Sequence, residues 1–172
     1  MLIELSILNQ LPVGSFDEGG LIGKVLRTII SRKDGRVLGF VVKKMGFFGE
    51  TKIASFEDII SIDQVGIVIR SSESLVDKEE IIRIGEILKE KFDLIGLKAV
   101  AKNKANLGRV ADALVNTDTG DIMRVYVKKF FKDYVFEHSQ IEEITLKNIV
   151  LHIERKEKAK KPIKGLAQAE VA

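Results

Sequence analysis

The first 73 residues contain short runs rich in Val and Ile, and these runs are separated by residues typical of turns. Runs of this kind favour β-strands over helices. We predict four strands in this part of the chain: 23–31, 36–44, 51–56 and 66–70. Strands this short, with turns at this spacing, indicate a small closed β-barrel, a form that also removes exposed sheet edges.

Two segments carry hairpin signals between neighbouring strands. Lys33-Asp34-Gly35-Arg36 contains the Asp-Gly pair, which readily adopts the positive backbone angles of a tight turn. Asp118-Thr119-Gly120-Asp121 has the same character in the second half of the chain. Both segments are therefore predicted to be turns between paired strands.

The pattern changes to a helical one between residues 74 and 92. Apolar residues follow each other at intervals of three or four, which places them on one helical face: Ile81, Ile84, Leu88 and Phe92. The segments that begin at Ser74 and at Asp77 both resemble capping boxes, and either is a candidate for the start of the helix. The apolar face is expected to pack on one or both barrels, with a partner-binding helix as the alternative.

An internal repeat organises the whole chain. Gly23-Lys24-Val25 and Gly108-Arg109-Val110 lie 85 residues apart, and the same offset relates Gly35 to Gly120. It also relates the Lys pair at 43–44 to the pair at 128–129. One offset that is kept by glycines, lysines and apolar positions predicts two copies of one unit.

The motif residues of these copies resemble the PRC-barrel family. The strongest match is 107–115 followed by 118–122, which is similar to the family's G-K/R-V-x-D strand, its turn and its next strand. The first copy carries the equivalent segments 21–25 and 34–37. It departs from the pattern at Arg27, which occupies the position equivalent to Asp112. We assign structural turn or motif roles to five residues: Gly23, Gly35, Gly108, Asp112 and Gly120. Asp112 is expected to bond backbone groups near the Gly120 turn.

The resemblance implies a small β-barrel that acts mainly as a docking module. Members of the family occur in the reaction-centre H subunit of photosynthetic bacteria, in a ribosome-maturation factor and in archaeal proteins linked to cell division. A tandem pair is more similar to the stand-alone members. The resemblance implies neither catalysis nor a cofactor.

Composition removes several classes of protein. The chain has no Cys, which excludes disulfides, thiolate nucleophiles and iron–sulfur clusters. It has two His, so a multi-histidine metal site is not expected and no metal is predicted. It has neither a membrane-length apolar run nor a signal-peptide pattern at its start, so we expect a cytoplasmic protein without a membrane span.

The segments after the two Lys pairs combine cationic and aromatic groups and are candidate partner-binding sites. They contain eight residues of interest: Lys43, Lys44, Phe47, Phe48, Lys128, Lys129, Phe130 and Phe131. Such groups can anchor a protein or stack on nucleic-acid bases. The simplest interpretation is that one Phe of each pair enters the barrel core while the lysines are solvated, because exposed adjacent Phe residues are costly.

The net charge of +3 is concentrated at the C-terminal end. Residues 1–73 and 93–154 are each neutral, 74–92 carry −1, and 155–172 carry +4. This last segment is too polar to fold alone and is predicted to be a flexible tail. Its basic residues are candidates for electrostatic contacts with nucleic acid or an anionic surface, or serve solubility alone: Arg155, Lys156, Lys158, Lys160, Lys161 and Lys164.

Catalysis finds little support in the remaining polar residues. The acidic pairs 57–58 and 142–143 each precede an apolar Ile and are expected to be solvated turn residues. His138 is next to Ser139, but sequence neighbours are poor evidence for a triad. His152 is expected to face outward or to fill a barrel edge.

The sequence thus predicts a mainly β protein of two tandem small barrels joined by one α-helix, with a disordered basic C-terminal tail. The predicted division is 1–73, 74–92, 93–154 and 155–172. The predicted function is non-enzymatic protein docking by an adaptor, in a cell-division or membrane-associated assembly, with homo-oligomerisation open. The alternative is an accessory factor associated with RNA or the ribosome, with the tail on phosphates.

Overall fold

The computed structural model describes residues 1–46 and 49–153, and within them the strands form two seven-stranded sheets. The first sheet has the order β6-β7-β2-β3-β4-β5-β8. Its strands are β2 (Pro12–Ser15), β3 (Gly20–Ser31), β4 (Arg36–Lys44), β5 (Thr51–Ser55), β6 (Ile59–Ile62), β7 (Ile67–Ile69) and β8 (Leu75–Val76). The protein is therefore mainly β, as predicted.

The second sheet repeats this arrangement with the order β13-β14-β9-β10-β11-β12, and β1 pairs with β10 beside it. Its strands are β1 (Leu2–Glu4), β9 (Lys98–Ala101), β10 (Asn106–Asn116), β11 (Ile122–Lys129), β12 (Lys132–Glu137), β13 (Ile141–Ile144) and β14 (Asn148–Leu151). Six strands thus share one order in the two sheets. The bulges also match, because the register shifts between Val25 and Arg27 on β3 and between Val110 and Asp112 on β10.

The predicted strands agree closely with the observed ones in the first sheet. The strand predicted over 36–44 is β4 with the same bounds, and the one predicted over 23–31 lies within β3. β5 ends at Ser55, one residue early, because Phe56 begins the short 3-10 helix η1 (Phe56–Asp58). Two further 3-10 helices are η2 (Ser72–Ser74) and η3 (His138–Gln140).

The helix predicted between the copies is α2 (Ile82–Lys89), and its apolar face packs on the first sheet. Ile84 is buried against Ile29 of β3 and Ile53 of β5. Neither predicted capping box starts this helix: its N-cap is Ile81, without a side-chain cap. The Asp77 N–H instead donates to Glu80 Oε1 at 2.9 Å, so this pair caps the turn that precedes α2.

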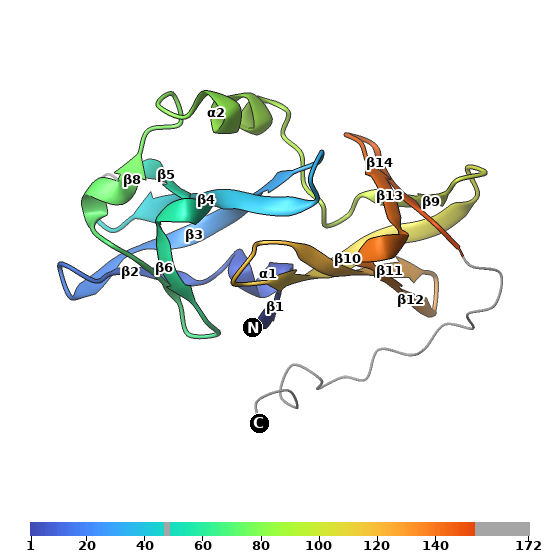
Figure 1. Ribbon diagram of the computed structural model, residues 1–172, viewed down its shortest axis with the longest axis horizontal. Helices are drawn as coiled ribbons and strands as arrows, with labels where there is room; N and C mark the ends of the chain where they lie inside the picture. The colour runs from blue at the N-terminus through green and yellow to red at the C-terminus, as the bar shows by residue number, and fades with distance from the viewer. Residues whose placement is uncertain (47–48, 154–172) are drawn as a thin grey trace.

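The segment before each sheet covers the other sheet (Figure 1). α2 precedes the second sheet but lies over the first, where Glu90 pairs with Arg32 at 2.7 Å. β1 and the short helix α1 (Leu5–Leu8) precede the first sheet, yet β1 pairs with β10 of the second. This exchange ties the two halves together.

The two predicted hairpin turns meet at the junction between the sheets. In Figure 1 the β3–β4 hairpin reaches toward the second sheet and the β10–β11 hairpin reaches back. Val37 N–H donates to the Gly120 carbonyl at 2.8 Å, and Ile122 N–H donates to the Gly35 carbonyl at 3.0 Å. Because 35 and 37 correspond to 120 and 122 by the 85-residue offset, the two bonds are related by pseudo-twofold symmetry.

One large apolar core runs through both halves. Phe40 and Val42 of β4 belong to the same buried cluster as Ile122 and Val125 of β11. A continuous core of this kind predicts that the two sheets unfold together.

Candidate functional site

The tip of the β11–β12 hairpin contains the predicted Phe pair of the second copy. β11 and β12 pair as far as Lys129 with Lys132, so Phe130 and Phe131 alone form the turn. Their exposed fractions are 85% and 103%. The interpretation that one Phe of each pair enters the core is therefore wrong for this pair, because a two-residue turn at the end of the sheet projects both rings outward.

The backbone of this tip is in an unfavourable conformation for a bulky side chain. Phe130 has a φ of 53°, in the left-handed region. Gly and Asn are the usual residues at such positions of two-residue hairpin turns. A non-glycine residue held there costs about 1–3 kcal/mol, which points to a use for the ring at that position.

The corresponding residues of the first copy are only partly within the described chain. Phe47 and Phe48 lie outside the residues that the structure describes, as do the six predicted contact residues of the tail. Lys43 and Lys44 lie on β4, where Lys43 is exposed and Lys44 half-buried. The Met45 N–H donates to the Ile22 carbonyl at 2.9 Å, which fixes the start of the segment that follows β4.

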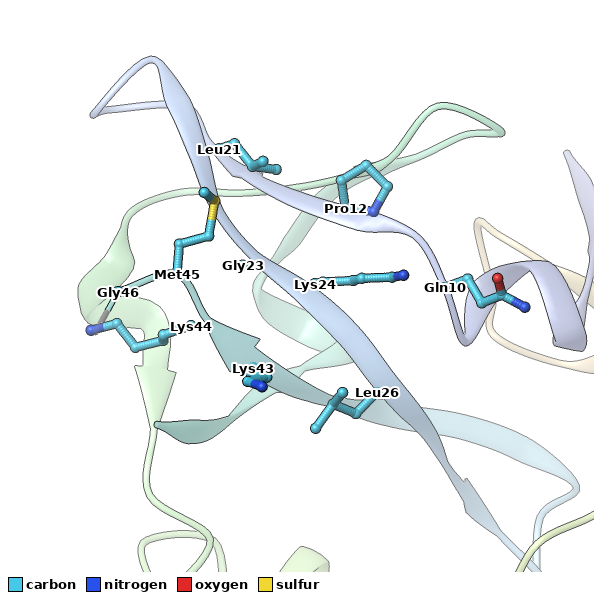
Figure 2. Close-up of a pocket in the computed structure, with 10 residues that line it drawn as sticks. All are labelled: Gln10, Pro12, Leu21, Gly23, Lys24, Leu26, Lys43, Lys44, Met45 and Gly46. Atoms are coloured by element: carbon cyan, nitrogen blue, oxygen red, sulfur yellow. The ribbon is translucent and has the colours of Figure 1, made fainter. Parts of the chain in front are cut away.

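A groove of about 580 Å³ runs over the outer side of the first sheet (Figure 2). Its lining comes from β2, β3, β4 and the residues around them: Gln10, Pro12, Leu21, Gly23, Lys24, Leu26, Lys43, Lys44, Met45 and Gly46. Figure 2 shows Met45 extending toward Leu21, and Lys24 extending toward Gln10. The groove thus contains both apolar and cationic side chains.

The apolar residues of this groove are unusually exposed for their type. The exposed fractions are 55% for Leu21, 50% for Leu26 and 62% for Met45. The β-bulge at Val25–Arg27 turns Leu26 outward, because the alternation of inward and outward side chains breaks there. Large apolar side chains gathered on one surface commonly mark an interaction site.

The charge of the groove has one sign. Lys24, Lys43 and Lys44 contribute three cations, and none of the lining residues is acidic. A second hollow of about 320 Å³, beside α2, differs because it contains Arg27, Lys78, Asp77 and Glu79 together. Next to it the Asp77 carboxylate, 2.9 Å from Lys52 Nζ, raises the pKa of that amine. Of these two hollows, only the groove over β3 and β4 has charged lining residues of a single sign.

The groove lysines keep a basic residue at the equivalent positions of the second sheet, Arg109, Lys128 and Lys129, but the large apolar residues of the groove change. By the 85-residue offset, Leu21 corresponds to Asn106, Leu26 to Ala111 and Met45 to Phe130. The exposed apolar residues of the groove therefore belong to the first copy alone, and the exposed aromatic tip belongs to the second. The two copies share a strand arrangement but have different surfaces.

The motif glycines of the two copies occupy equivalent places. A Cβ on Gly23 would lie 2.8 Å from the Lys43 carbonyl oxygen, and one on Gly108 would collide with the Lys128 carbonyl oxygen. Gly108 also has a φ of 123°, which side chains rarely tolerate. These glycines allow neighbouring strands to approach closely and carry no chemistry.

Asp112 differs from expectation in its partners. Its carboxylate accepts hydrogen bonds from the Ser6 N–H at 3.1 Å, from Ser6 Oγ at 2.5 Å and from the Ala113 N–H at 2.8 Å. It therefore anchors α1 to β10 instead of bonding the Gly120 turn. The sequence could not reveal this, because Ser6 and Asp112 are 106 residues apart.

The acidic and histidine candidates are held as surface groups. Glu57, Asp58, Glu142 and Glu143 are exposed. Both histidines have partners, since His138 Nδ1 lies 2.7 Å from the Ile122 carbonyl oxygen and His152 Nδ1 lies 3.3 Å from Glu142 Oε1. Within residues 1–46 and 49–153, no three His, Asp or Glu side chains gather in a way that could hold a metal ion.

Sequence reasoning missed the groove residues Leu21, Lys24, Leu26 and Met45. The available signal was weak: Ile22 and Leu26 lie two residues before and after Lys24, where strict alternation would place polar residues. Whether such a residue faces solvent depends on the bulge, which the sequence does not mark.

Comparison with known proteins agrees with this fold. Residues 2–76 match the family model of the PRC-barrel domain. This part of the chain therefore resembles a PRC-barrel domain. The match includes β8 (Leu75–Val76), which pairs with β5 of the first sheet. No curated protein matches the chain.

Apart from β1, the second sheet lies outside the residues matched by the PRC-barrel model, although it contains the Gly108–Asp112 motif. Its relation to the PRC-barrel domain rests on the shared order of six strands and on the matched bulges. None of the helices within residues 1–46 and 49–153 combines the length and apolar character needed to cross a bilayer.

Proposed function

We propose that this chain is a non-enzymatic docking protein whose PRC-barrel domain holds a short segment of a partner protein in the groove over β3 and β4. The observation that carries the proposal is the row of exposed apolar side chains, Leu21, Leu26 and Met45, beside three lysines. The occupant that fits is an extended segment that alternates apolar and acidic side chains.

The apolar side chains of the groove supply the affinity in this proposal. Burying a Leu or Met side chain contributes about 1.5–3 kcal/mol relative to leaving it exposed. Three half-exposed side chains therefore offer a few kcal/mol, part of which offsets the ordering of the bound segment. This balance is typical of a reversible docking contact.

The lysines supply orientation and selectivity. Lys24, Lys43 and Lys44 line one groove, and none of the other lining residues is acidic, so these amines attract a carboxylate on the partner. Complementary charge mainly raises the association rate and rejects wrong partners. A segment rich in Lys or Arg would accordingly be excluded.

The adaptor role rests on the two-copy organisation. We retain the division into a first repeat (1–73), a connector (74–92), a second repeat (93–154) and a tail (155–172) as part of the proposal. The reciprocal bonds between the Gly35 and Gly120 turns hold the repeats together, so two different surfaces are presented by one body. In line with the family resemblance, we propose that it serves a cell-division or membrane-associated assembly in the cytoplasm.

Selection from a random peptide library displayed on phage tests the groove. We expect wild-type protein to enrich peptides that combine apolar and acidic residues, with dissociation constants that rise with salt. Leu26→Asp should weaken a selected peptide about tenfold or more, because it places a carboxylate among the apolar side chains of the groove.

The chain offers matched controls for this experiment. Leu146 has the same exposed fraction as Leu26, 50%, but lies outside the groove, so Leu146→Asp should bind normally. Lys43→Glu should also weaken binding, whereas Lys128→Glu, at the equivalent position of the second copy, should not. Enrichment of peptides without acidic residues, or unchanged binding by Leu26→Asp, would contradict the proposal.

A further inference from the structure

The β11–β12 tip is a second surface that the groove does not use. Phe130 and Phe131 are adjacent, almost wholly exposed and located at the outermost point of the hairpin. Phe130 is held at a φ of 53° although a bulky residue is disfavoured there. Two apolar rings kept in this position indicate a ligand into which the projecting tip can insert both rings.

Lysines surround this tip. Lys128 and Lys129 precede the two rings on β11, and Lys132 follows them on β12. Lys128 and Lys132 are exposed, while Lys129 Nζ donates to the Asn106 carbonyl at 2.7 Å. That bond brings the start of β10 to the same end, together with exposed Lys104 in the preceding loop.

Acidic residues at this end are few. Asp133 is opposite Lys128 in the β-ladder, and Glu142 lies 3.9 Å from Lys102. With Glu143, next to Glu142 on β13, these are three carboxylates against five lysines in this part of the described chain: Lys102, Lys104, Lys128, Lys129 and Lys132. The end of the second sheet around the two rings thus carries a net positive charge.

The described chain also ends here. β14 runs parallel to β9, and its last residue, Leu151, is opposite Ala101, just before the loop that contains Lys102 and Lys104. Ile153, two residues later, is 49% exposed. The segment that continues from it, 154–172, has six basic and three acidic residues. The basic part of the sequence therefore starts at the same end as the tip.

We propose that the β11–β12 tip inserts Phe130 and Phe131 into the surface of a membrane that contains anionic lipid, with the surrounding lysines on the headgroup phosphates. Aromatic rings are accommodated at the boundary between headgroups and acyl chains, and basic residues close to them are attracted by anionic lipid. Lysines reach the phosphates while their methylene stems stay beside the apolar layer.

The shape of the tip favours lipid over the other macromolecules that aromatic and cationic groups bind. Recognition of single-stranded nucleic acid uses rings spread along a groove or sheet face, on which successive bases stack. Here both rings occupy one tight turn. A fluid membrane interface receives two adjacent rings without a preformed pocket. Its anionic headgroups also carry the charge opposite to that of the lysines around the tip.

Vesicle co-sedimentation of the full chain tests this inference. With vesicles of phosphatidylcholine and about 30% phosphatidylserine, we expect binding that falls when the salt is raised to about 1 M. The double variant Phe130→Ser, Phe131→Ser should bind the vesicles at least about tenfold more weakly than the wild type. Phe16→Ser is the matched control, because Phe16 is an exposed ring (65%) in the turn between β2 and β3.

Tryptophan fluorescence gives an independent readout, because the chain has no Trp. Emission of Phe131→Trp should shift to shorter wavelength when the anionic vesicles are added, and that of Phe16→Trp should not. An unshifted Phe131→Trp spectrum would show that this ring does not enter the bilayer and would overturn the proposal.

Three other outcomes would also overturn it. They are equal binding by the double Phe variant and the wild type, loss of binding only in a Lys160→Glu, Lys161→Glu variant, and binding to single-stranded RNA in place of vesicles through the same Phe residues. Peptide binding in the groove serves as a separate assay, so failure of either proposal leaves the other testable.

Discussion

Gly120→Val should lower the free energy of unfolding by about 2–4 kcal/mol. Gly120 has a φ of 78°, where a β-branched residue is strained. Its new Cβ would also lie 3.1 Å from the Val37 carbonyl oxygen and 3.2 Å from Cζ of Phe56, both on the first half of the chain. The substitution therefore forces the two hairpin turns apart, and chemical denaturation measures the loss.

Gly19→Val separates this effect from backbone strain alone. Gly19 has a similar φ of 64°, but nothing lies within 4 Å of the position of its Cβ. Its variant should lose only the strain, about 1–2 kcal/mol. Equal losses in the two variants would mean that the contact between the turns contributes nothing to stability.

Phe40→Ala should lower the free energy of unfolding by about 3–5 kcal/mol, because it removes a fully buried ring from the core. Phe40 belongs to the first sheet, but its core cluster continues into the second. The loss should therefore appear in both sheets at the same denaturant concentration. Phe16→Ala, which removes an exposed ring, should change stability by less than about 0.5 kcal/mol.

The chain provides a probe for each part of this prediction. Both of its tyrosines, Tyr126 on β11 and Tyr134 on β12, lie in the second sheet, so tyrosine fluorescence reports on that sheet. Far-UV circular dichroism reports on all strands. A tyrosine transition that stays at the wild-type midpoint, while the dichroism transition shifts, would show that the two sheets unfold separately.

Local elements of the fold were accessible from the sequence because short-range chemistry specifies them. The Asp34-Gly35 turn and the strand 36–44 follow from turn residues and Val-rich alternation, and both are present in the structure. The 85-residue repeat correctly indicated that the second sheet would follow the first in strand order. These features depend on neighbours in the chain.

Contacts between distant segments were not accessible in the same way. Leu2–Glu4 is too short for its alternation to be read, and its pairing with β10 depends on a strand more than 100 residues away. The meeting of the two Gly turns uses backbone groups, which every residue has. The sequence could therefore predict each turn but not the hydrogen bonds between the two turns.

The functional surfaces were missed or misjudged for a related reason. Burial is the default expectation for a Phe, so the simplest interpretation placed one ring of each pair in the core. The two-residue turn overrides that preference at Phe130 and Phe131. At Leu26 a β-bulge overrides the preference of an apolar side chain for burial. The equivalent residue of the second copy is Ala111, so the strand arrangement does not require a large side chain at this position.

The divergence of the copies gives the chain two kinds of surface on one rigid frame. The first copy has an apolar groove with lysines, and the second has a projecting aromatic tip with lysines. In the account developed above, the groove binds a protein segment and the tip binds a lipid surface. A docking protein with these two sites would hold its partner at a membrane.

The docking claim is tested most directly by NMR, by measuring the shifts of the protein's amide signals when a selected peptide with acidic and apolar residues is added. The account predicts that the largest shifts on peptide addition occur at Lys24, Leu26, Lys43 and Met45, around the groove over β3 and β4. The equivalent positions of the second copy, Arg109, Ala111 and Lys128, should shift little. Largest shifts on β10 and β11, or shifts that leave the groove unchanged, would contradict it.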